Sequence, residues 1–317
     1  MPHGHEDPYV CTLSEKLQEK AARELNETAE SRERCFREII ERTKSRPDIR
    51  FRCDEAFLLR FLRARKFDVD RAFKNLVRYY EVRKEYPAVF DDLTVSSVRH
   101  VLDMKMNITL PPECRDRDGN RVGILRFGSW EPRVCSYGDT VKLSVISSEK
   151  LLEDEEIQIN GITAILDFGN LGMRHSAYIL PSNAKMMMSI LQSVLPTRYN
   201  TMHYVNLPPV FEQGMVIYRQ FMSEKMKQRT KLHTGKAWKD SIKDFFPASC
   251  LPSDYGGSCP SFDEMCSSFN NQLLDWEDDF LRQQKNFGLV KKKDILGSKK
   301  CSENDGGLAG TFKKLEM

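Results

Sequence analysis

Positive charge gathers in the stretch FMSEKMKQRTKLH, which contains a single acidic residue, Glu224. Its basic residues occupy every second position: Lys225, Lys227, Arg229 and Lys231. Lysine and arginine form strong charge-assisted hydrogen bonds with phosphate, and arginine can bind it through two parallel bonds. The pattern is therefore typical of three structures: a solvated helix end, a nucleic-acid patch or a seat for a phosphorylated head group.

Residues that could do covalent or acid–base chemistry form no recognisable arrangement. The sequence has no GxSxG, HExxH, GxGxxG or GxxxxGK motif. Asp116, Asp118 and Asn120 have the spacing of a calcium loop, but Arg121 stands where that loop needs glycine and Phe127 where it needs glutamate. The segment therefore indicates a turn before a strand.

Histidine and cysteine give no sign of a metal centre. The six histidines form no cluster, and the nine cysteines show neither a CxxC pair nor zinc-ligand spacing. We therefore expect no catalytic residue, no metal and no cofactor other than a bound ligand.

The composition narrows the class of protein. The chain has 317 residues, of which 40% are hydrophobic, enough for one large or two small domains with a core. Its 49 basic and 46 acidic residues give a net charge of +3, which argues against a general nucleic-acid partner. No signal peptide and no run of about 18 apolar residues is visible, so we expect a cytoplasmic location.

Two patterns of elements position these residues. The first ~90 residues indicate successive helices, with Asp54 and Asp70 as expected N-caps. After residue 95, short apolar runs alternate with helical patterns, which predicts an α/β fold with a mostly parallel sheet covered by helices. The expected strands are 122–127, 161–168, 201–207 and 229–233, and the expected helices are 139–154, 181–194 and 208–227.

Three segments, in this order, resemble one family. AFLLRFLRARKFD (56–68) is similar to the signature of its helical N-terminal region, EDEEIQINGITAILDF (153–168) to its central helix–strand passage, and LPSDYGG (251–257) to its closing motif. The family is the CRAL-TRIO (Sec14-like) lipid-binding family. WEPRVCSYGD and FMSEKMKQR resemble most the branch that contains the tocopherol transfer protein, the cellular retinaldehyde-binding protein and the clavesins.

The resemblance implies a domain plan and a lipid cavity. It implies a sheet floor and a helical lid over an apolar cavity that holds one hydrophobic small molecule. The expected units are a partly helical N-terminal extension (1–27), a helical N-terminal domain (28–92), a CRAL-TRIO lipid-binding domain (93–275), and a C-terminal helix end with a disordered basic tail (276–317).

The resemblance also implies which residues form the cavity. The wall would include Val141, Ser144, Ser148, Ile162, Leu166, Met187, Ile190, Leu191 and Leu195, and the lid would carry Phe211, Met215, Tyr218 and Met222. Ser144 and Ser148 lie one helical turn apart and could bind a polar ligand head or their own helix carbonyls. Val141, Leu166 and Leu195 replace aromatic residues of the tocopherol transfer protein, so tocopherol itself is not assigned. Gly214 inside the lid is a candidate hinge.

The same resemblance also implies a role for the basic stretch. A phosphoinositide head group would be bound by Arg65, Arg198, Lys225, Lys227 and Arg229. The implied function is a carrier that transfers a tocopherol-, retinoid- or similar lipid at phosphoinositide-containing membranes. The alternative is a phosphoinositide-binding trafficking adaptor of the clavesin type. Either would associate peripherally with endosomal or other intracellular membranes.

Overall fold

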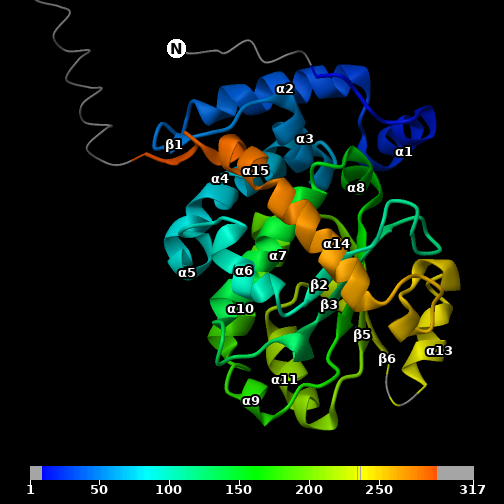
Figure 1. Ribbon diagram of the computed structural model, residues 1–317. Coiled ribbons are helices and arrows are strands. Elements are labelled where there is room, and N and C mark those ends of the chain that lie inside the picture. Colours follow the sequence, from blue (N-terminus) through cyan, green and yellow to red (C-terminus); the bar gives the residue numbers. More distant parts are fainter. Residues whose placement is uncertain (1–8, 234, 236, 291–317) are drawn as a thin grey trace, which may run out of the picture.

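A helical N-terminal region lies against one end of a helix-covered sheet (Figure 1). The computed structural model describes residues 9–233, 235 and 237–290. Helices of the first half are α1 (Glu15–Leu25), α2 (Ala29–Thr43), α3 (Glu55–Ala64), α4 (Val69–Glu85), α5 (Pro87–Phe90), α6 (Arg99–Leu102), α7 (Tyr137–Leu151) and α8 (Glu155–Asn160). Those of the second half are α9 (Met173–Ser176), α10 (Pro181–Ser189), α11 (Pro209–Gln220), α12 (Glu224–Gln228), α13 (Trp238–Lys243), α14 (Phe262–Asp275) and α15 (Glu277–Gln284).

The strands of the described residues form two sheets. They are β1 (Ile49–Arg50), β2 (Asn107–Thr109), β3 (Arg121–Arg126), β4 (Ile162–Asp167), β5 (Tyr199–Val205), β6 (Thr230–His233) and β7 (Gly288–Leu289). β1 and β7 form a small antiparallel pair, and the main sheet has the order β2-β3-β4-β5-β6. Only β2 is antiparallel to its neighbour in the main sheet. The expected α/β fold with a mostly parallel sheet is confirmed, and β3 to β6 correspond to the four expected strands.

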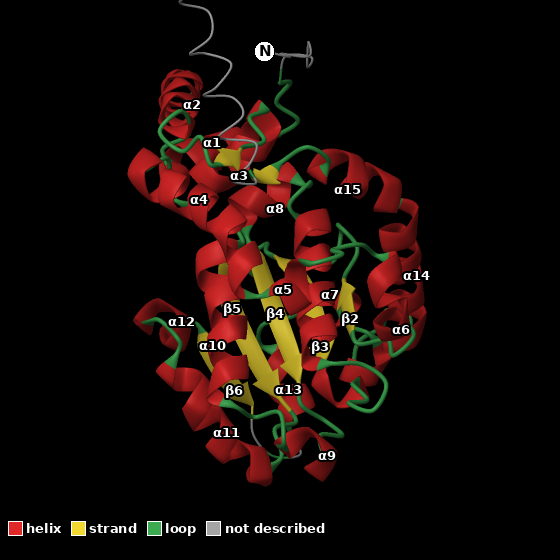
Figure 2. Ribbon diagram, turned by 90° about the vertical axis from the view of Figure 1, so that its left-hand side faces the viewer, coloured by secondary structure: helices red, strands yellow, loops and turns green. Residues whose placement is uncertain are grey.

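The two faces of the main sheet bury different sets of residues. Parallel neighbours need crossover helices, and right-handed crossovers between consecutive strands fall on one face. Figure 1 shows α7, α10 and α11 on one side of the strands and α13 on the other, and Figure 2 shows the strands side by side. Side chains alternate between the faces. On β4, Ala164 and Leu166 face the crossover helices, whereas Ile165 packs in a second core with Phe246 of the far side.

Local signals fix the ends of the early helices. Asp54 caps α3 by accepting a hydrogen bond from the Phe57 backbone N–H at 3.0 Å, as expected. The prediction for Asp70 is wrong, because Asp68 is the N-cap of α4 and accepts from the Arg71 N–H at 3.0 Å. Asp70 lies instead in the first turn, where a carboxylate still interacts favourably with the helix dipole.

Two expected helices are each divided. The helix expected over 181–194 is α10 followed by one turn of π-helix at 190–194, which the Leu195 N–H closes by donating to the Ile190 carbonyl at 3.1 Å. The helix expected over 208–227 is α11 and α12, because the Ser223 side chain caps a new helix start. The chain therefore changes direction between the predicted lid and the basic stretch.

A buried arginine joins the N-terminal helices to α8. Arg63 donates to both oxygens of Glu27, at 2.7 and 2.8 Å, to Glu155 Oε1 at 2.9 Å and to Gln158 Oε1 at 2.8 Å. Burial, the largest influence, lowers the pKa of Arg63, but the hydrogen bonds and charges of its partners raise it above its ordinary value. Because the Arg63 guanidinium donates to Glu27 before α2 and to Glu155 and Gln158 of α8, it fixes how α3 and α8 pack together.

The segment LPSDYGG forms a tight turn at the far face of the sheet. Gly256 has a φ of 79°, in the left-handed region that favours glycine. A Cβ on Gly257 would lie 1.9 Å from the Leu251 carbonyl oxygen, so no larger residue fits there. The turn buries Tyr255, whose hydroxyl donates to Asp167 Oδ2 at 2.7 Å at the end of β4.

The expected basic tail, 291–317, lies outside the described residues. Within the described part of the chain, no helix combines the length and apolar character needed to cross a membrane.

Candidate ligand cavity and basic groove

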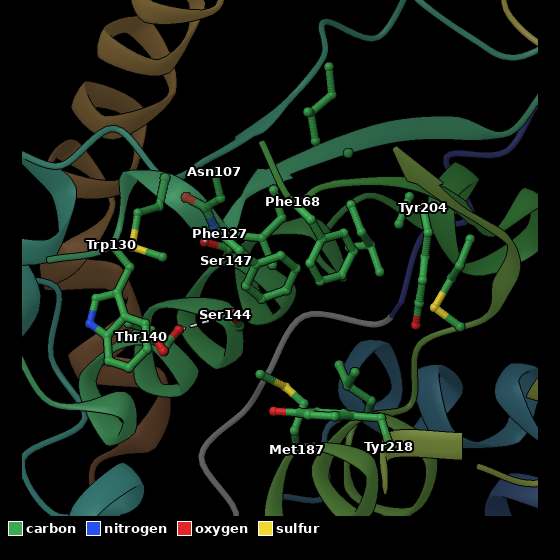
Figure 3. Close-up of a pocket in the computed structure, with 18 of the residues that line it drawn as sticks. Asn107, Phe127, Trp130, Thr140, Ser144, Ser147, Phe168, Met187, Tyr204 and Tyr218 are labelled. Atoms are coloured by element: carbon green, nitrogen blue, oxygen red, sulfur yellow. Dashed lines mark hydrogen bonds between the residues drawn. The ribbon is translucent and has the colours of Figure 1, made fainter. Parts of the chain in front are cut away.

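An apolar cavity lies between the sheet and its crossover helices. It contains about 1540 Å³ of empty space, its open mouth included, and no Lys, Arg, Asp or Glu is among its described lining residues. Phe127 and Phe168 stack with ring centroids 4.8 Å apart, and Figure 3 shows both rings bordering the space. Concave sites lined by apolar and aromatic side chains suit hydrophobic small molecules.

The predicted wall residues fall into two groups. Those that line the cavity are Ser144, Ser148, Ile162, Leu166, Met187 and Leu191. Val141, Ile190 and Leu195 are instead buried in the core beside it, so their prediction as wall residues is wrong. On α7, Thr140 and Ser144 face the cavity, and Val141 is rotated by about 100° from Thr140. Ile190 begins the π-helical turn and Leu195 directly follows it, and the turn shifts their direction.

The serine hydroxyls of the wall bond to their own helix. Ser144 Oγ donates to the Thr140 carbonyl at 3.0 Å, and Ser148 Oγ donates to the Ser144 carbonyl at 2.8 Å. Of the two roles that the sequence left open, the structure shows the bond to the helix carbonyl.

The apolar stripe of α11, the predicted lid, faces inward. Phe211, Met215 and Tyr218 line the cavity, whereas Met222, just beyond α11, lines the neighbouring groove. A Cβ on Gly214 would lie 2.9 Å from Ile179 Cγ2, so glycine permits close packing of the lid. The hinge role of Gly214 stays a prediction.

A pair of tyrosines connects the lid to α7. The hydroxyls of Tyr137 and Tyr218 lie 3.1 Å apart, within hydrogen-bond distance. Burial raises the pKa of both groups, so both hydroxyls are neutral near physiological pH. The pair therefore joins α11 to α7 through one neutral hydrogen bond.

A groove lined by basic residues lies beside the cavity. Arg65, Arg198, Lys225 and Arg229 line it as predicted, and Lys66, Arg71 and Lys185 join them. Lys227 does not line the groove and pairs with Glu224 at 2.7 Å, which contradicts its predicted place. Two residues along a helix correspond to about 200° of rotation, so Lys225 and Lys227 leave α12 in nearly opposite directions.

The groove concentrates positive charge that the protein itself leaves unpaired. No described carboxylate forms an ion pair with Arg65, Arg198, Lys225 or Arg229. Backbone carbonyls orient the guanidinium groups instead: Arg198 donates to Ile159 and Arg229 to Tyr199. Burial lowers the pKa of Lys225, and Arg229, Lys66, Arg198 and Arg65 lower it further by repulsion. An anion bound here would relieve that repulsion.

The described residues hold no group of three or more His, Cys, Asp or Glu side chains arranged for a metal ion.

Comparison with known proteins identifies the family. A model described as the CRAL/TRIO domain matches residues 104–257, and one described as a Pinta-like UBA domain matches residues 28–99. The alpha-tocopherol transfer protein-like protein of Homo sapiens is 36% identical over 287 residues, which are 89% of this chain and 82% of that protein. This chain belongs to the CRAL/TRIO family.

Other CRAL/TRIO relatives are less similar. Clavesin-2 of Homo sapiens is 31% identical over 268 residues, 84% of this chain and 81% of that protein. Clavesin-1 of Xenopus laevis is 31% identical over 255 residues, which are 79% of this chain and 75% of that protein. A solved structure titled "Crystal structure of Sfh5" aligns with a TM-score of 0.47 and 13% identity, covering 80% of this chain and 99% of that chain. That likeness is too weak to add to the assignment.

Sequence reasoning missed most of the aromatic lining of this CRAL/TRIO cavity. Phe127 directly follows β3 and Phe168 directly follows β4. Ligands of parallel sheets bind beyond the carboxyl ends of the strands, so the position of these residues was a usable signal. No comparable signal marks Lys66, Arg71 and Lys185, which meet only through the packing of α3, α4 and α10.

Proposed function

We propose that this CRAL/TRIO chain is a carrier that encloses one hydrophobic small molecule and exchanges it at phosphoinositide-containing membranes. The observation that supports the carrier most directly is the apolar cavity, which is covered by α11 and has no Lys, Arg, Asp or Glu among its described lining residues. Each CH₂ group taken from water contributes about 0.8 kcal/mol, so such a cavity can hold a lipid tightly without any covalent bond. The relative named alpha-tocopherol transfer protein-like agrees with this class of cargo.

Exposed apolar side chains support contact with a membrane. Met173 of α9 is 73% exposed, Val216 of the lid 60% and Leu180 46%. Figure 1 shows α9 and α11 at the same end of the molecule. Apolar residues at such an end can enter a bilayer interface while basic residues attract its anionic head groups.

The basic groove supports a phosphorylated head group as the membrane ligand. It gathers unpaired arginine and lysine side chains at a surface next to the lid. The overall charge is near zero, so this concentration is local and does not favour nucleic acid.

The carrier is tested by transfer. Native mass spectrometry of the purified chain, followed by extraction, should show one apolar molecule per chain. Labelled cargo should then move from donor to acceptor vesicles, faster when the acceptors contain phosphatidylinositol bisphosphate. A chain that holds no apolar molecule and moves none between vesicles would contradict the proposal.

The second candidate is a trafficking adaptor, which the similarity to the clavesins and the surface position of the groove favour. An adaptor should bind phosphoinositide vesicles equally well with an empty or a filled cavity. A carrier should bind them differently in the two states, so vesicle binding of stripped and loaded protein separates the two functions.

A further inference from the structure

Three cysteines from distant parts of the sequence gather on the face of the sheet away from the cavity. Cys114 lies in the loop after β2, Cys250 ends a short 3₁₀ turn, and Cys259 follows the LPSDYGG segment. Cys114 and Cys250 belong to the second core, and Cys259 packs against it. None of the three lines the cavity or the basic groove, so neither proposed binding site accounts for them.

The thiols of Cys114 and Cys259 are in contact. Their Sγ atoms lie 3.9 Å apart. Both approach the carbonyl oxygen of Ser249, which is 4.0 Å from the Cys114 sulfur and 3.1 Å from the Cys259 sulfur. The bonding distance of two sulfur atoms is about 2 Å, so a movement of about 1 Å by each would reach it. Small side-chain movements therefore place a disulfide within reach.

Backbone hydrogen bonds hold the segments that carry these two thiols. The Cys259 N–H donates to the Leu251 carbonyl at 3.0 Å, and the Cys259 carbonyl accepts from the Ser253 N–H at 3.1 Å. The Cys114 N–H donates to the Pro111 carbonyl at 2.9 Å. The fold itself thus brings the two sulfur atoms together.

Solvent reaches the two thiols unequally. Cys114 is 5% exposed, whereas Cys259 is partly exposed. Burial, and after it the charges of Cys250 and Cys259, raise the pKa of Cys114 to about 12, so this thiol stays protonated near neutral pH. An oxidant from solution therefore meets Cys259 first, with Cys114 directly behind it. This is the arrangement of a reactive cysteine beside a resolving one.

We propose that Cys114 and Cys259 form a reversible disulfide when the protein meets a hydroperoxide. The Cys259 thiolate attacks the O–O bond and becomes a sulfenic acid, and the released alkoxide takes up the proton that the thiol had lost. Cys114 then attacks the Cys259 sulfur, the S–S bond forms, and the departing hydroxide leaves as water with the Cys114 proton. The two thiols lose two electrons in all, and the peroxide gains them.

The disulfide would fasten the closing turn to the loop after β2. It would join residues 145 positions apart, and closing so long a loop lowers the entropy of the unfolded chain. We therefore expect the Tm of the oxidised protein to lie about 3–7 °C above that of the reduced protein. The site is independent of the carrier function, because neither thiol lines the cavity or the groove.

Oxidation of the full-length chain with hydrogen peroxide tests the site. Reduced protein is freed of reductant, treated with the peroxide, and its remaining thiols are blocked with N-ethylmaleimide. Intact mass spectrometry should show two fewer blocked thiols than in untreated protein, and peptide mapping should find Cys114 joined to Cys259. Dithiothreitol should reverse both the cross-link and the rise in Tm.

Single-sulfur variants assign the two roles. Cys259→Ser should abolish the cross-link, and so should Cys114→Ser. Only Cys114→Ser should leave a sulfenic acid on Cys259, which dimedone traps. If a buried serine hydroxyl prevents folding there, Cys114→Ala removes the same sulfur without it. Cys250→Ser is the matched control, because it removes the third thiol of the cluster and should keep the cross-link.

The alternative outcomes count against the site in different ways. Treated wild-type protein without a cross-link, or with a disulfide between another pair of cysteines, overturns the proposal. A cross-link that is lost in folded Cys250→Ser would make Cys250 the resolving thiol, and a dimedone adduct on Cys114 in Cys259→Ser would reverse the order of attack. Either result overturns the assigned roles. Loss of cargo transfer in Cys259→Ser would overturn the independence of the site from the carrier function.

Discussion

Replacing Lys225 with alanine removes one ammonium group from the basic groove, whereas replacing Lys227 removes the same charge from the same short helix but outside the groove. Lys225 is repelled by Arg229 and three further cations, and Lys227 is already paired with Glu224 at 2.7 Å. The two variants therefore have the same net charge and differ in which side of α12 they alter. Comparing them distinguishes a specific phosphate-binding site from general electrostatic attraction to anions.

The magnitude follows from the contact that each variant loses. A hydrogen bond to a charged group contributes about 1.5–3 kcal/mol, so Lys225→Ala should weaken phosphate binding about ten- to hundredfold. Lys227→Ala should weaken it by less than about threefold, because an exposed charge is screened within about 8–10 Å. Both variants should fold, since Lys225 is exposed and the Lys227–Glu224 ion pair lies at the surface, where such pairs contribute little to stability.

The assay is calorimetry with a short-chain phosphatidylinositol bisphosphate, repeated at rising salt concentration. Wild-type affinity should fall with salt, and the salt dependence should be weaker for Lys225→Ala than for Lys227→Ala. Equal losses in the two variants would show that net charge alone governs binding. Unchanged binding in Lys225→Ala would remove this residue from the site.

Three further predictions concern stability, each measured by urea unfolding. Gly257→Ala should lower the free energy of unfolding by more than about 3 kcal/mol or prevent folding, because its Cβ would collide with a backbone oxygen. Gly172→Ala should leave that free energy nearly unchanged, because a Cβ there would meet nothing within 4 Å, and the reverse order would refute the packing argument. Arg63→Met should cost about 3–5 kcal/mol because it leaves carboxylates buried, and adding Glu27→Gln should recover part of it unless the network is unimportant. Burial lowers the pKa of His203 to about 3, below its unfolded value of about 6.5. Its contribution to the free energy of unfolding is therefore fully present above about pH 6.5 and should be lost as the pH falls towards 3. A free energy of unfolding that stays level between about pH 6.5 and 5 would contradict this.

The sequence predicted what short-range patterns control and missed what depends on packing. The apolar run of β4 and the cap at Asp54 are local, and both are found where expected. With Asp68 only two residues from Asp70, either aspartate suited the cap, and spacing could not choose between them. The direction of Ile190 depends on a π-helical turn that a regular helical period does not contain.

The groove shows the same limit in its charges. Residue type and a family resemblance brought Arg65 and Arg198 together with Lys225 from distant parts of the chain. They could not show that Glu224 would form an ion pair with Lys227, because that pairing depends on where α12 begins. The aromatic lining was not predicted for a different reason: Phe127 and Phe168 belong to no helical stripe, because each directly follows a strand.

One feature of the cavity wall links its contents to the outer surface. Met188, Leu191 and Tyr199 line both the cavity and the basic groove, so the two hollows are separated by a partition one side chain thick. Occupants on its two sides are then thermodynamically linked: the factor by which a head group changes the affinity for cargo equals the factor by which cargo changes the affinity for that head group. A tenfold factor, about 1.4 kcal/mol, would suffice for a membrane to distinguish full from empty protein. Such coupling would set where the protein releases its cargo, while the net direction of transport would still follow the gradient of cargo or of head group between the membranes.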